Sequence, residues 1–355
     1  MFGYHNKIVQ DDMKEIFNRS YDWDKLKGKK VLITGASGML ASYMTFFLAF
    51  LNEEHHFDIT IYALVRNQQK AKSKFAGIDQ KPYFHYAVQD VCEEIDIQDN
   101  VDYIVHAAGN ASPRFILSDP VGIIKANTLG MISVLEFARK SNTSKVVFTS
   151  TREVYGETKD IEHKITEEDM GRLSLNELRN CYPESKRMSE ILLKSYEYQY
   201  KIPYVSARIA HTYGPGMEIE NDGRVMADLV SDVVHTRDII LKSDGTAERA
   251  FCYITDAIAG LFLLLLEGES GEAYNVANET KDYMIREVAQ RLISLYPEKQ
   301  LSLRFEIPES QSIGYSRMGR TKLDTGKMEK LGWYPQVGLD TGLQRTVDSF
   351  ICEER

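Results

Sequence analysis

The feature that most constrains the fold is a repeated alternation of short β-branched runs with longer helical stretches. Buried strands are predicted at KKVLITG, DITIYALV, VDYIVHAA and SKVVFTS, and IPYVSARI at 202–209 supplies another. Segments around 117–140 and 184–200 follow strands and carry apolar positions at helical spacing. Neighbouring parallel strands need a long crossover, usually a helix, so this alternation predicts a parallel sheet wound with helices.

The pattern divides the chain into three segments. Residues 1–27 are polar and aromatic, and we expect an accessory segment packed on the main lobe. Residues 28–210 should form the large lobe, with a later strand returning to it near 236–260. After Tyr213 the sequence becomes irregular, so 211–355 should form most of a smaller, interleaved α+β lobe. A chain of 355 residues is long enough for both lobes to bury a core.

A glycine-rich turn, VLITGASGMLAS, lies between the first strand and the first helix of this alternation. One glycine allows the tight turn, and the next lets the backbone approach a pyrophosphate at the positive end of the helix. The turn therefore predicts a Rossmann-type, doubly wound dinucleotide-binding lobe. The expected cofactor contacts here are Gly35, Ser37, Gly38, Met39 and Leu40.

The second strand lacks the acidic residue that usually holds the 2'-hydroxyl of the adenosine ribose in NAD. YALVRN offers Arg66 at its end, and an arginine can instead hold the 2'-phosphate of NADP. NAD is the expected cofactor, and Arg66 leaves NADP open. Asp90, in VQDV, could accept from the adenine amino group, and HAAG brings small residues close to the cofactor. The expected contacts in these two stretches are Asp90, Val91, Ala107, Ala108 and Gly109.

Tyr182 and Lys186 lie four residues apart in NCYPESKR, where a proline fits the first turn of a helix. Both side chains therefore face the same way. A tyrosine acts as a base near neutrality only if its pKa falls by roughly 3 units, and we expect the lysine and an oxidised nicotinamide to lower it. A hydroxyl at the end of FTSTREVYG would bond the substrate oxygen; Thr151 is preferred, with Ser150 as the alternative.

From residue 28 onward the chain resembles the extended short-chain dehydrogenases that remodel nucleotide sugars. It is most similar to UDP-glucuronate decarboxylases in HAAGNASPRFILSDPVGIIKANTLG, STREVYG, NCYPESKR, ARIAHTYGPGM, DGRV and RAFCYITDA. The resemblance implies a tightly held NAD that oxidises the sugar at C4, a homodimer formed through a helical face, and Asn127 beside the active-site lysine. The candidates for binding the nucleotide sugar are Ser112, Arg152, Arg179, His211, Arg224 and Arg249, with Arg317 and Arg320 as weaker choices.

Arg152 and Glu153 bear on the choice of reaction. The resemblance places Glu153 beside the sugar C5, and in related 4,6-dehydratases an Asp-Glu pair stands here. Arginine is a poor proton donor but a good partner for a carboxylate, which a glucuronate carries. Decarboxylation of a UDP-glucuronate-like substrate is therefore favoured, although decarboxylases usually have a small residue at the position of Arg152. A 4,6-dehydratase, a C4 epimerase and a non-catalytic dinucleotide-binding regulator are the alternatives.

Composition narrows the partners. A net charge of -9 argues against an extended nucleic-acid surface, and 43% apolar residues with 27% charged are ordinary for a globular protein. No apolar run near residue 1 resembles a signal peptide, and LFLLLLEG at 261–268 is too short to span a bilayer. The four cysteines are scattered and show no metal-binding or disulfide spacing. We therefore expect a cytoplasmic protein with no membrane partner and no metal site.

Overall fold

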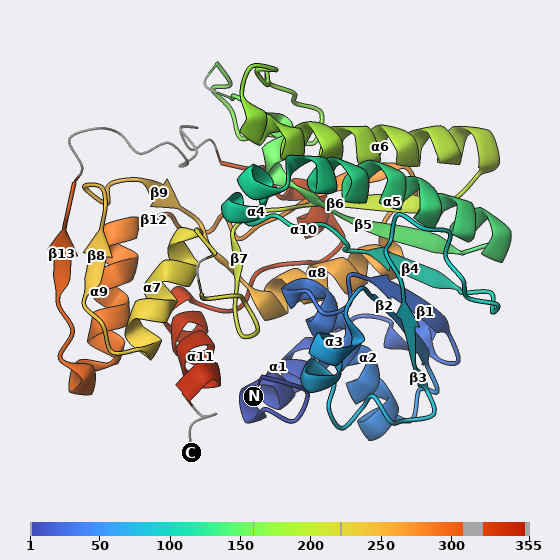
Figure 1. Cartoon of the computed structure of the whole chain (residues 1–355), viewed down its shortest axis with the longest axis horizontal. Helices are drawn as coiled ribbons and strands as arrows, with labels where there is room; N and C mark the ends of the chain where they lie inside the picture. Colours follow the sequence, from blue (N-terminus) through green and yellow to red (C-terminus); the bar gives the residue numbers. More distant parts are fainter. Residues whose placement is uncertain (1, 159, 221, 308–321, 352–355) are drawn as a thin grey trace.

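A seven-stranded parallel sheet forms the centre of the molecule (Figure 1). The computed structural model describes residues 2–351 apart from 159, 221 and 308–321. The sheet has the order β11-β6-β5-β4-β1-β2-β3, and each pair in it is parallel. Its strands are β1 (Lys30–Thr34), β2 (Thr60–Val65), β3 (Phe84–Val88), β4 (Tyr103–His106), β5 (Lys145–Thr151), β6 (Tyr204–Ile209) and β11 (Glu272–Val276). The predicted α/β class and doubly wound sheet are confirmed.

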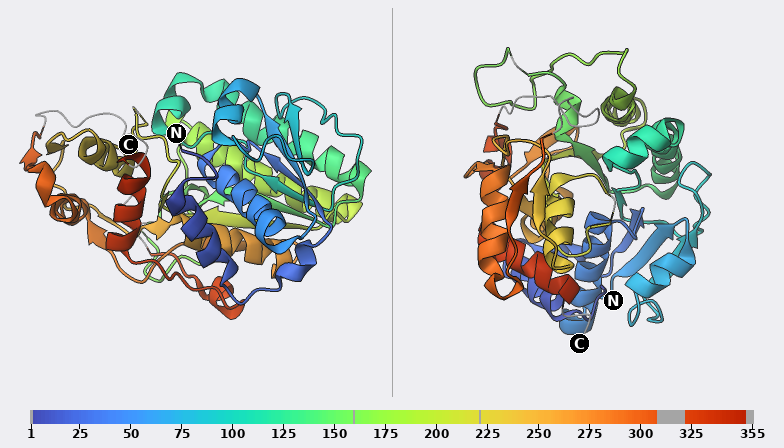
Figure 2. Two further views of the ribbon diagram at one scale, coloured as in Figure 1. Left: turned by 90° about the horizontal axis from the view of Figure 1, so that it is seen from below. Right: turned by 60° about the vertical axis from the view of Figure 1, so that its left-hand side comes forward.

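Helices cover both faces of this sheet (Figures 1 and 2). Helices α2 (Met39–His55) and α8 (Ile254–Glu267) lie on one face, and α5 (Pro120–Ser141) and α6 (Cys181–Tyr200) lie on the other. Side chains alternate along a strand, so Ile33 packs into the α2/α8 core and Leu32 into the α5/α6 core. By length and composition alone α5 could cross a membrane, but here it packs against α6 and the sheet.

The strand that returns to the large sheet is β11, at 272–276, rather than a strand near 236–260. The apolar run in the predicted region forms β8 (Ile239–Leu241), which pairs with β13 (Leu303–Phe305) outside the large sheet. The burial patterns give the physical reason. Strand β8 has one exposed residue between two buried ones, whereas β11 ends in three consecutive buried residues. Strands covered on both faces are buried continuously.

A smaller lobe lies beside the carboxyl ends of β5 and β6 (Figures 1 and 2). In its described residues, helices alternate with three two-stranded sheets. The elements not yet named in this lobe are β7 (Thr212–Tyr213), α7 (Val225–Val234), β9 (Glu248–Arg249), β10 (Cys252–Tyr253), β12 (Tyr283–Met284), α9 (Ile285–Leu295) and α11 (Leu339–Ile351). Helix α10 (Gly326–Lys330) instead packs against β11 of the large sheet. The shorter helices of the large lobe are α3 (Gln68–Lys74) and α4 (Pro113–Ser118).

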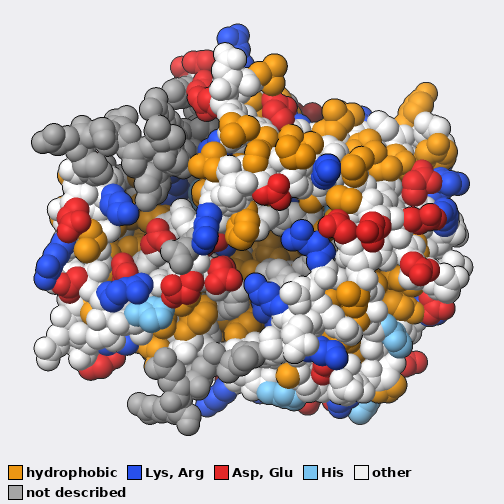
Figure 3. All heavy atoms as spheres, in the orientation of Figure 1, with side chains coloured by type: hydrophobic (Ala, Val, Ile, Leu, Met, Phe, Trp, Pro, Cys, Tyr) orange, Lys and Arg blue, Asp and Glu red, His pale blue; other side chains and the backbone are white. Residues whose placement is uncertain are grey.

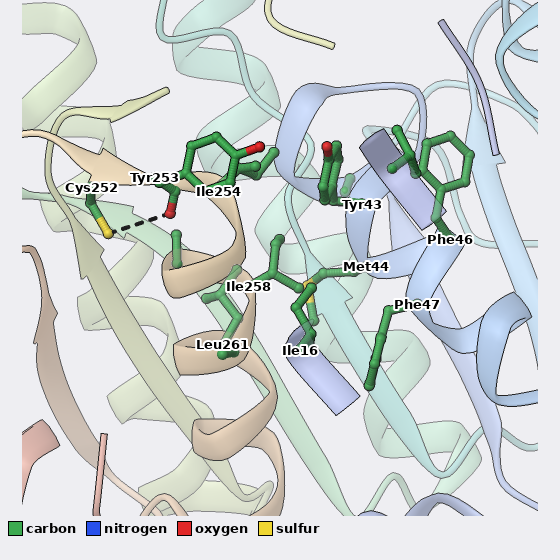
Figure 4. Packing of buried hydrophobic residues seen from close by; sticks show 14 of the residues in the cluster. Ile16, Tyr43, Met44, Phe46, Phe47, Cys252, Tyr253, Ile254, Ile258 and Leu261 are labelled. Atoms are coloured by element: carbon green, nitrogen blue, oxygen red, sulfur yellow. Dashed lines mark hydrogen bonds between the residues drawn. The ribbon is translucent and has the colours of Figure 1, made fainter. Parts of the chain in front are cut away.

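The accessory segment contains α1 (Lys7–Phe17), which packs against α2, α8 and α11. Figure 4 shows Ile16 of α1 in the same buried cluster as Met44 and Phe47 of α2 and Ile258 of α8. The segment therefore contacts the smaller lobe as well as the main lobe.

Candidate active site

The site lies where the strand order reverses, at the carboxyl ends of β1 and β4. The chain leaves β1 towards β2 and β3, and then returns to place β4 on the other side of β1. In doubly wound sheets a ligand crevice opens at this point. Figure 3 shows the surface hollowed between the two lobes, with Lys and Arg side chains at the rim.

The glycine turn has the geometry that a pyrophosphate needs. Gly35 has a φ of 63°, and a Cβ added to it would lie 2.7 Å from the Cα of Ala108. Only glycine fits at this contact, which brings the turns after β1 and β4 together. Gly38 is the N-cap of α2, and Met39 begins the helix as predicted. The cradle between these turns fits a dinucleotide, because it lies at the start of a helix, where the first N-H groups have no partner within the helix and the dipole is positive.

Two residues that the sequence reasoning missed hold these turns in place. The hydroxyl of Thr34 lies 2.8 Å from Nδ1 of His106 and accepts from the backbone N-H groups of Ala107 and Ala108, at 3.2 Å each. Burial lowers the pKa of His106 to about 3, with a further contribution from Lys186, so the ring is neutral. The apolar alternation placed both in strands and gave no sign of their pairing.

Lys186 and Asn127 form the floor of the crevice. The Nζ of Lys186 donates to the carbonyl of Thr149 at 2.8 Å, and burial lowers the pKa of this lysine to about 7. The amide nitrogen of Asn127 donates to Ser185 at 2.8 Å, while its buried Oδ1 has no partner among the described residues. A Cβ at Gly109 would lie 2.9 Å from that oxygen. This unpaired acceptor at the crevice fits a bound cofactor that supplies a donor.

The structure brings Tyr182 and Thr151 together. The phenol is buried and forms a hydrogen bond with Thr151. Its pKa is raised, first by burial and then by Glu153, so the surroundings of Tyr182 act against the lowering that we expected. The expected shift relied on two cations, and Lys186 is itself easily deprotonated here. Ser150, the alternative, instead donates to Glu190 at 2.5 Å, away from the phenol.

The charged candidates pair with one another. Nη1 of Arg152 donates to Nε2 of His211 at 3.0 Å. Glu153 accepts two hydrogen bonds from Arg179, at 2.7 and 3.0 Å, so both carboxylate oxygens are oriented. His211 has a φ of 47°, a conformation that a residue other than glycine seldom adopts and one often found at functional sites.

The remaining sugar-nucleotide candidates are less closely grouped. Ser112 donates to the carbonyl of Asp222 at 2.7 Å, and Arg224 pairs with the carboxylate of Asp222. Asp222 was missed because a single aspartate in a loop gives no sequence signal. Arg249 lies in β9 and donates to the carbonyl of Glu248 at 2.7 Å. The weaker candidates, Arg317 and Arg320, lie outside the described residues.

The residues predicted to contact the adenosine follow β2 and β3. Arg66 is exposed, and Asp90 accepts from the N-H of Cys92 at 2.9 Å. This hydrogen bond is the main cause of a lowered pKa at Asp90, and the nearby Arg66 also contributes. Val91 is buried against Gly130 of α5.

The fold and this site define an α/β enzyme that binds a dinucleotide beside a Tyr-Lys pair. The model of the NAD dependent epimerase/dehydratase family matches residues 31–277. The chain belongs to this family, and it is an NAD-dependent enzyme of this kind. The match ends before most of the smaller lobe, and segment 2–27 lies outside it.

Relatives and solved structures agree with this family. UDP-glucuronic acid decarboxylase 6 of Arabidopsis thaliana is 31% identical over 323 residues, which are 90% of this chain and 88% of that protein. UDP-glucuronic acid decarboxylase 1 of Danio rerio is 29% identical over 92% of this chain and 73% of its own length. The fold is similar to that of DesIV, a dTDP-glucose 4,6-dehydratase of Streptomyces venezuelae whose structure has NAD and TYD bound. The two structures match with a TM-score of 0.76 and 24% sequence identity, and the match covers 90% of this chain and 96% of that one.

Proposed function

We propose that this chain oxidises a nucleotide-linked hexuronic acid at C4 and releases its carboxyl group as carbon dioxide, with UDP-glucuronate as the expected substrate. The observation that carries the proposal is the meeting, at one edge of the sheet, of the Thr151–Tyr182 pair with two oriented arginines, Arg152 and Arg179. Hydroxyl oxidation and carboxylate binding are thereby available in the same crevice. The relatives that are named UDP-glucuronic acid decarboxylases support this choice.

Thr151, Tyr182 and Lys186 serve the oxidation. Thr151 positions the sugar C4 hydroxyl, and the phenol of Tyr182 takes its proton. Lys186 lies one helical turn after Tyr182 on α6, and its Nζ is held by the carbonyl of Thr149. It supplies positive charge next to the phenol. A bound NAD would supply the acceptor for the C4 hydride and the later donor.

Arg152 acts on the carboxyl group of the sugar, and Glu153 acts at C5. Once C4 is a ketone, the uronic acid is a β-keto acid, which loses carbon dioxide readily when it is held in a suitable orientation. Arg152 binds the carboxylate in the ground state, because a guanidinium forms paired hydrogen bonds with it. Loss of carbon dioxide leaves an enolate that must gain a proton at C5. Glu153, oriented by Arg179, would pass that proton to C5 from solvent water.

A nucleotide-sugar 4,6-dehydratase or C4 epimerase is the second candidate, and the dehydratase DesIV shares the fold. Dehydration needs an acid to protonate the leaving hydroxyl at C6. Arg152 occupies the place of that acid, and its guanidinium stays protonated at any working pH. The chemistry of this residue therefore favours decarboxylation.

A substrate panel separates these reactions. The protein is incubated with UDP-glucuronate, UDP-glucose, dTDP-glucose and CDP-glucose, while released carbon dioxide and 4-keto products are followed. We expect carbon dioxide from UDP-glucuronate alone. A 4-keto-6-deoxy product from any neutral sugar, without carbon dioxide from the uronate, would overturn the assignment.

Two variants test the roles within the reaction. Tyr182→Phe should lower kcat by at least about a thousandfold, because the phenolic oxygen is lost. Arg152→Gln should raise KM for UDP-glucuronate by about tenfold or more while NAD binding stays unchanged. Arg237→Gln is the matched control, since Arg237 pairs with Asp232 on the smaller lobe. Turnover of Tyr182→Phe at the wild-type rate would contradict the mechanism.

We also infer that the protein is a homodimer that works in the cytoplasm. Cys92, Cys181 and Cys252 are free thiols, as expected in a reducing compartment. Apolar side chains gather over α5 and α6 along the upper edge of Figure 3. The exposed ones are Val121, Ile124, Leu129 and Ile132 on α5 and Met188, Ile191, Tyr198 and Tyr200 on α6. A contiguous apolar surface of this kind favours a second copy of the chain as its partner.

A further inference from the structure

Phe2, at the start of the described chain, packs next to the cofactor crevice. Its ring stacks on Tyr43 with centroids 6.2 Å apart and meets Phe46 at 5.9 Å, both on α2. On another side it fills the space beside Gly216, where an added Cβ would lie 2.4 Å from the ring. Phe2 therefore lies between the first helix of the large lobe and the loop that enters the smaller lobe.

Lys74 connects Phe2 to the glycine turn. Its Nζ lies 5.3 Å from the centroid of the Phe2 ring and donates to the carbonyl of Ser37 at 2.9 Å. Burial lowers the pKa of Lys74 to about 8, with a smaller contribution from Lys70. An ammonium group in such a place is strongly oriented, because an aromatic face and a carbonyl are the main partners left to it. Ser37 lies between the two glycines that shape the turn.

The rest of the segment is anchored to both lobes. Arg19 forms a buried ion pair with Asp256 of α8 at 2.5 Å, and it donates to the carbonyl of Tyr334 at 2.9 Å. Asp12 of α1 accepts from Tyr43 at 2.9 Å. It also accepts from Arg345 of α11 at 3.0 Å. With these anchors the segment cannot shift without disturbing elements of both lobes.

We propose that residues 2–27 form a brace for the cofactor site, in which Phe2 holds Lys74 against the Ser37 carbonyl and so keeps the glycine turn in its dinucleotide-binding geometry. Phe2 and Lys74 are positioning residues in this proposal. The brace lies outside the region matched by the family model, so it is an addition to the family's catalytic unit. The proposal rests on the proposed function only through the cofactor site, and it needs no particular sugar.

NAD binding to the full chain tests the brace. The dissociation constant and the release rate of NAD are measured by calorimetry and stopped-flow fluorescence, and thermal melts follow stability. Lys74→Met and Phe2→Ala should each weaken NAD binding by about fivefold or more, and Phe2→Tyr, which keeps the ring, should restore it. Combining Lys74→Met with Phe2→Ala should add little, because both act through one contact.

Two control variants separate positioning from general stability. Lys70→Met removes a charge from the same helix without touching Ser37. Phe17→Ala removes an aromatic ring of α1 that stacks on His55, 3.8 Å between centroids, away from the glycine turn. We expect Phe17→Ala to lower the melting temperature while leaving NAD affinity unchanged.

The outcomes distinguish the brace from the site. Unchanged NAD affinity in Lys74→Met, or equal losses in Phe2→Ala and Phe17→Ala, would overturn the brace alone. A wild-type chain that binds no NAD would overturn both the brace and the proposed cofactor site. Normal NAD binding with no turnover of any nucleotide sugar would contradict the proposed reaction but not the proposed brace.

Discussion

Lys186 and Tyr182 are neighbours in a site that solvent hardly reaches, and burial acts on them in opposite directions. It lowers the pKa of the lysine to about 7 and raises that of the phenol. Both shifts favour neutral groups. Without cofactor the protein therefore holds a neutral phenol beside a lysine that titrates near neutrality, and in the proposed mechanism the phenol becomes a base only when further positive charge is bound next to it. Base activity is thus confined to the loaded site.

The lysine predicts a pH dependence of stability in the protein without cofactor. The unfolded chain holds the Lys186 proton up to pH about 10.4, whereas the folded chain releases it near pH 7, so stability from this group rises with pH between these values. Between pH ~7 and ~9 the wild type should gain about 2 kcal/mol over Lys186→Met. Urea unfolding of both proteins at the two pH values measures this difference. Parallel curves would contradict the buried, easily deprotonated lysine.

Arg66 predicts the cofactor preference. It is exposed at the end of β2, where a carboxylate would hold the ribose hydroxyls of NAD. The wild type should therefore bind NADP as well as NAD, and Arg66→Asp should shift the ratio of the two dissociation constants towards NAD by about tenfold or more. Lys72→Met, on the following helix, is the control. A wild type that excludes NADP would show that Arg66 faces solvent only.

Single residues show where sequence reasoning reaches its limit. The spacing of Tyr182 and Lys186 could be read directly, because both belong to one helix. The choice between Thr151 and Ser150 could not, since adjacent strand residues point in opposite directions and nothing local says which side holds the phenol. Glu190, forty residues further along, takes the Ser150 hydroxyl. Thr34 and His106 were missed for the same reason, because their pairing joins two strands.

At the scale of elements, the sheet was predictable and the smaller lobe was not. Strands covered on both faces appear as continuous apolar runs, as in β1 and β5. The returning strand β11 has the sequence EAYNV, in which Glu272 and Asn275 interrupt the apolar residues, so it does not appear as a continuous apolar run. The apolar residues within 236–260 belong to strands of two-stranded sheets and to the start of α8. Whether such short strands form, and in which sheet, depends on pairing partners that are distant in the sequence.

The attachment of α1 can be tested through Asp12. This buried carboxylate accepts from Tyr43, Tyr253 and Arg345, and Asp12→Ala would leave all three without it. Removing one partner from a buried charged network costs about 3–5 kcal/mol. Urea unfolding should show a loss of that order. Asp11→Ala is the matched control, because Asp11 is exposed beside Lys14 and should cost less than about 0.5 kcal/mol.

At the scale of the whole molecule, the two lobes are joined by contacts that the sequence pattern could not reveal. The accessory segment contacts α2 and α8 of the large lobe and α11 of the smaller one. Pattern reasoning treats each stretch by its own periodicity, so it identified a polar, aromatic beginning and could not locate its partners. Buried pairs such as Arg19 with Asp256 link positions more than two hundred residues apart.

The α5/α6 surface predicts the assembly. Exposed apolar residues recur along each helix, and several of them are three residues apart, such as Val121 and Ile124 on α5 and Met188 and Ile191 on α6. They therefore form two adjacent stripes. Two copies related by a twofold axis would bury both stripes against their equivalents. Ile191 is 58% exposed in the single chain. Ile191→Asp would place a carboxylate in that contact, where it would lose water without gaining a partner.

Sedimentation velocity should therefore show a dimer for the wild type and a monomer for Ile191→Asp at the same concentration. The folded monomer should keep its NAD affinity, because the glycine turn and the Tyr182–Lys186 pair do not lie on the exposed surface of α5 and α6. Ile307→Asp is the matched control: Ile307 is 62% exposed, similar to Ile191, but lies on the smaller lobe, and this variant should remain a dimer. A wild type that sediments as a monomer, or an Ile191→Asp variant that stays dimeric, would show that this surface does not mediate assembly.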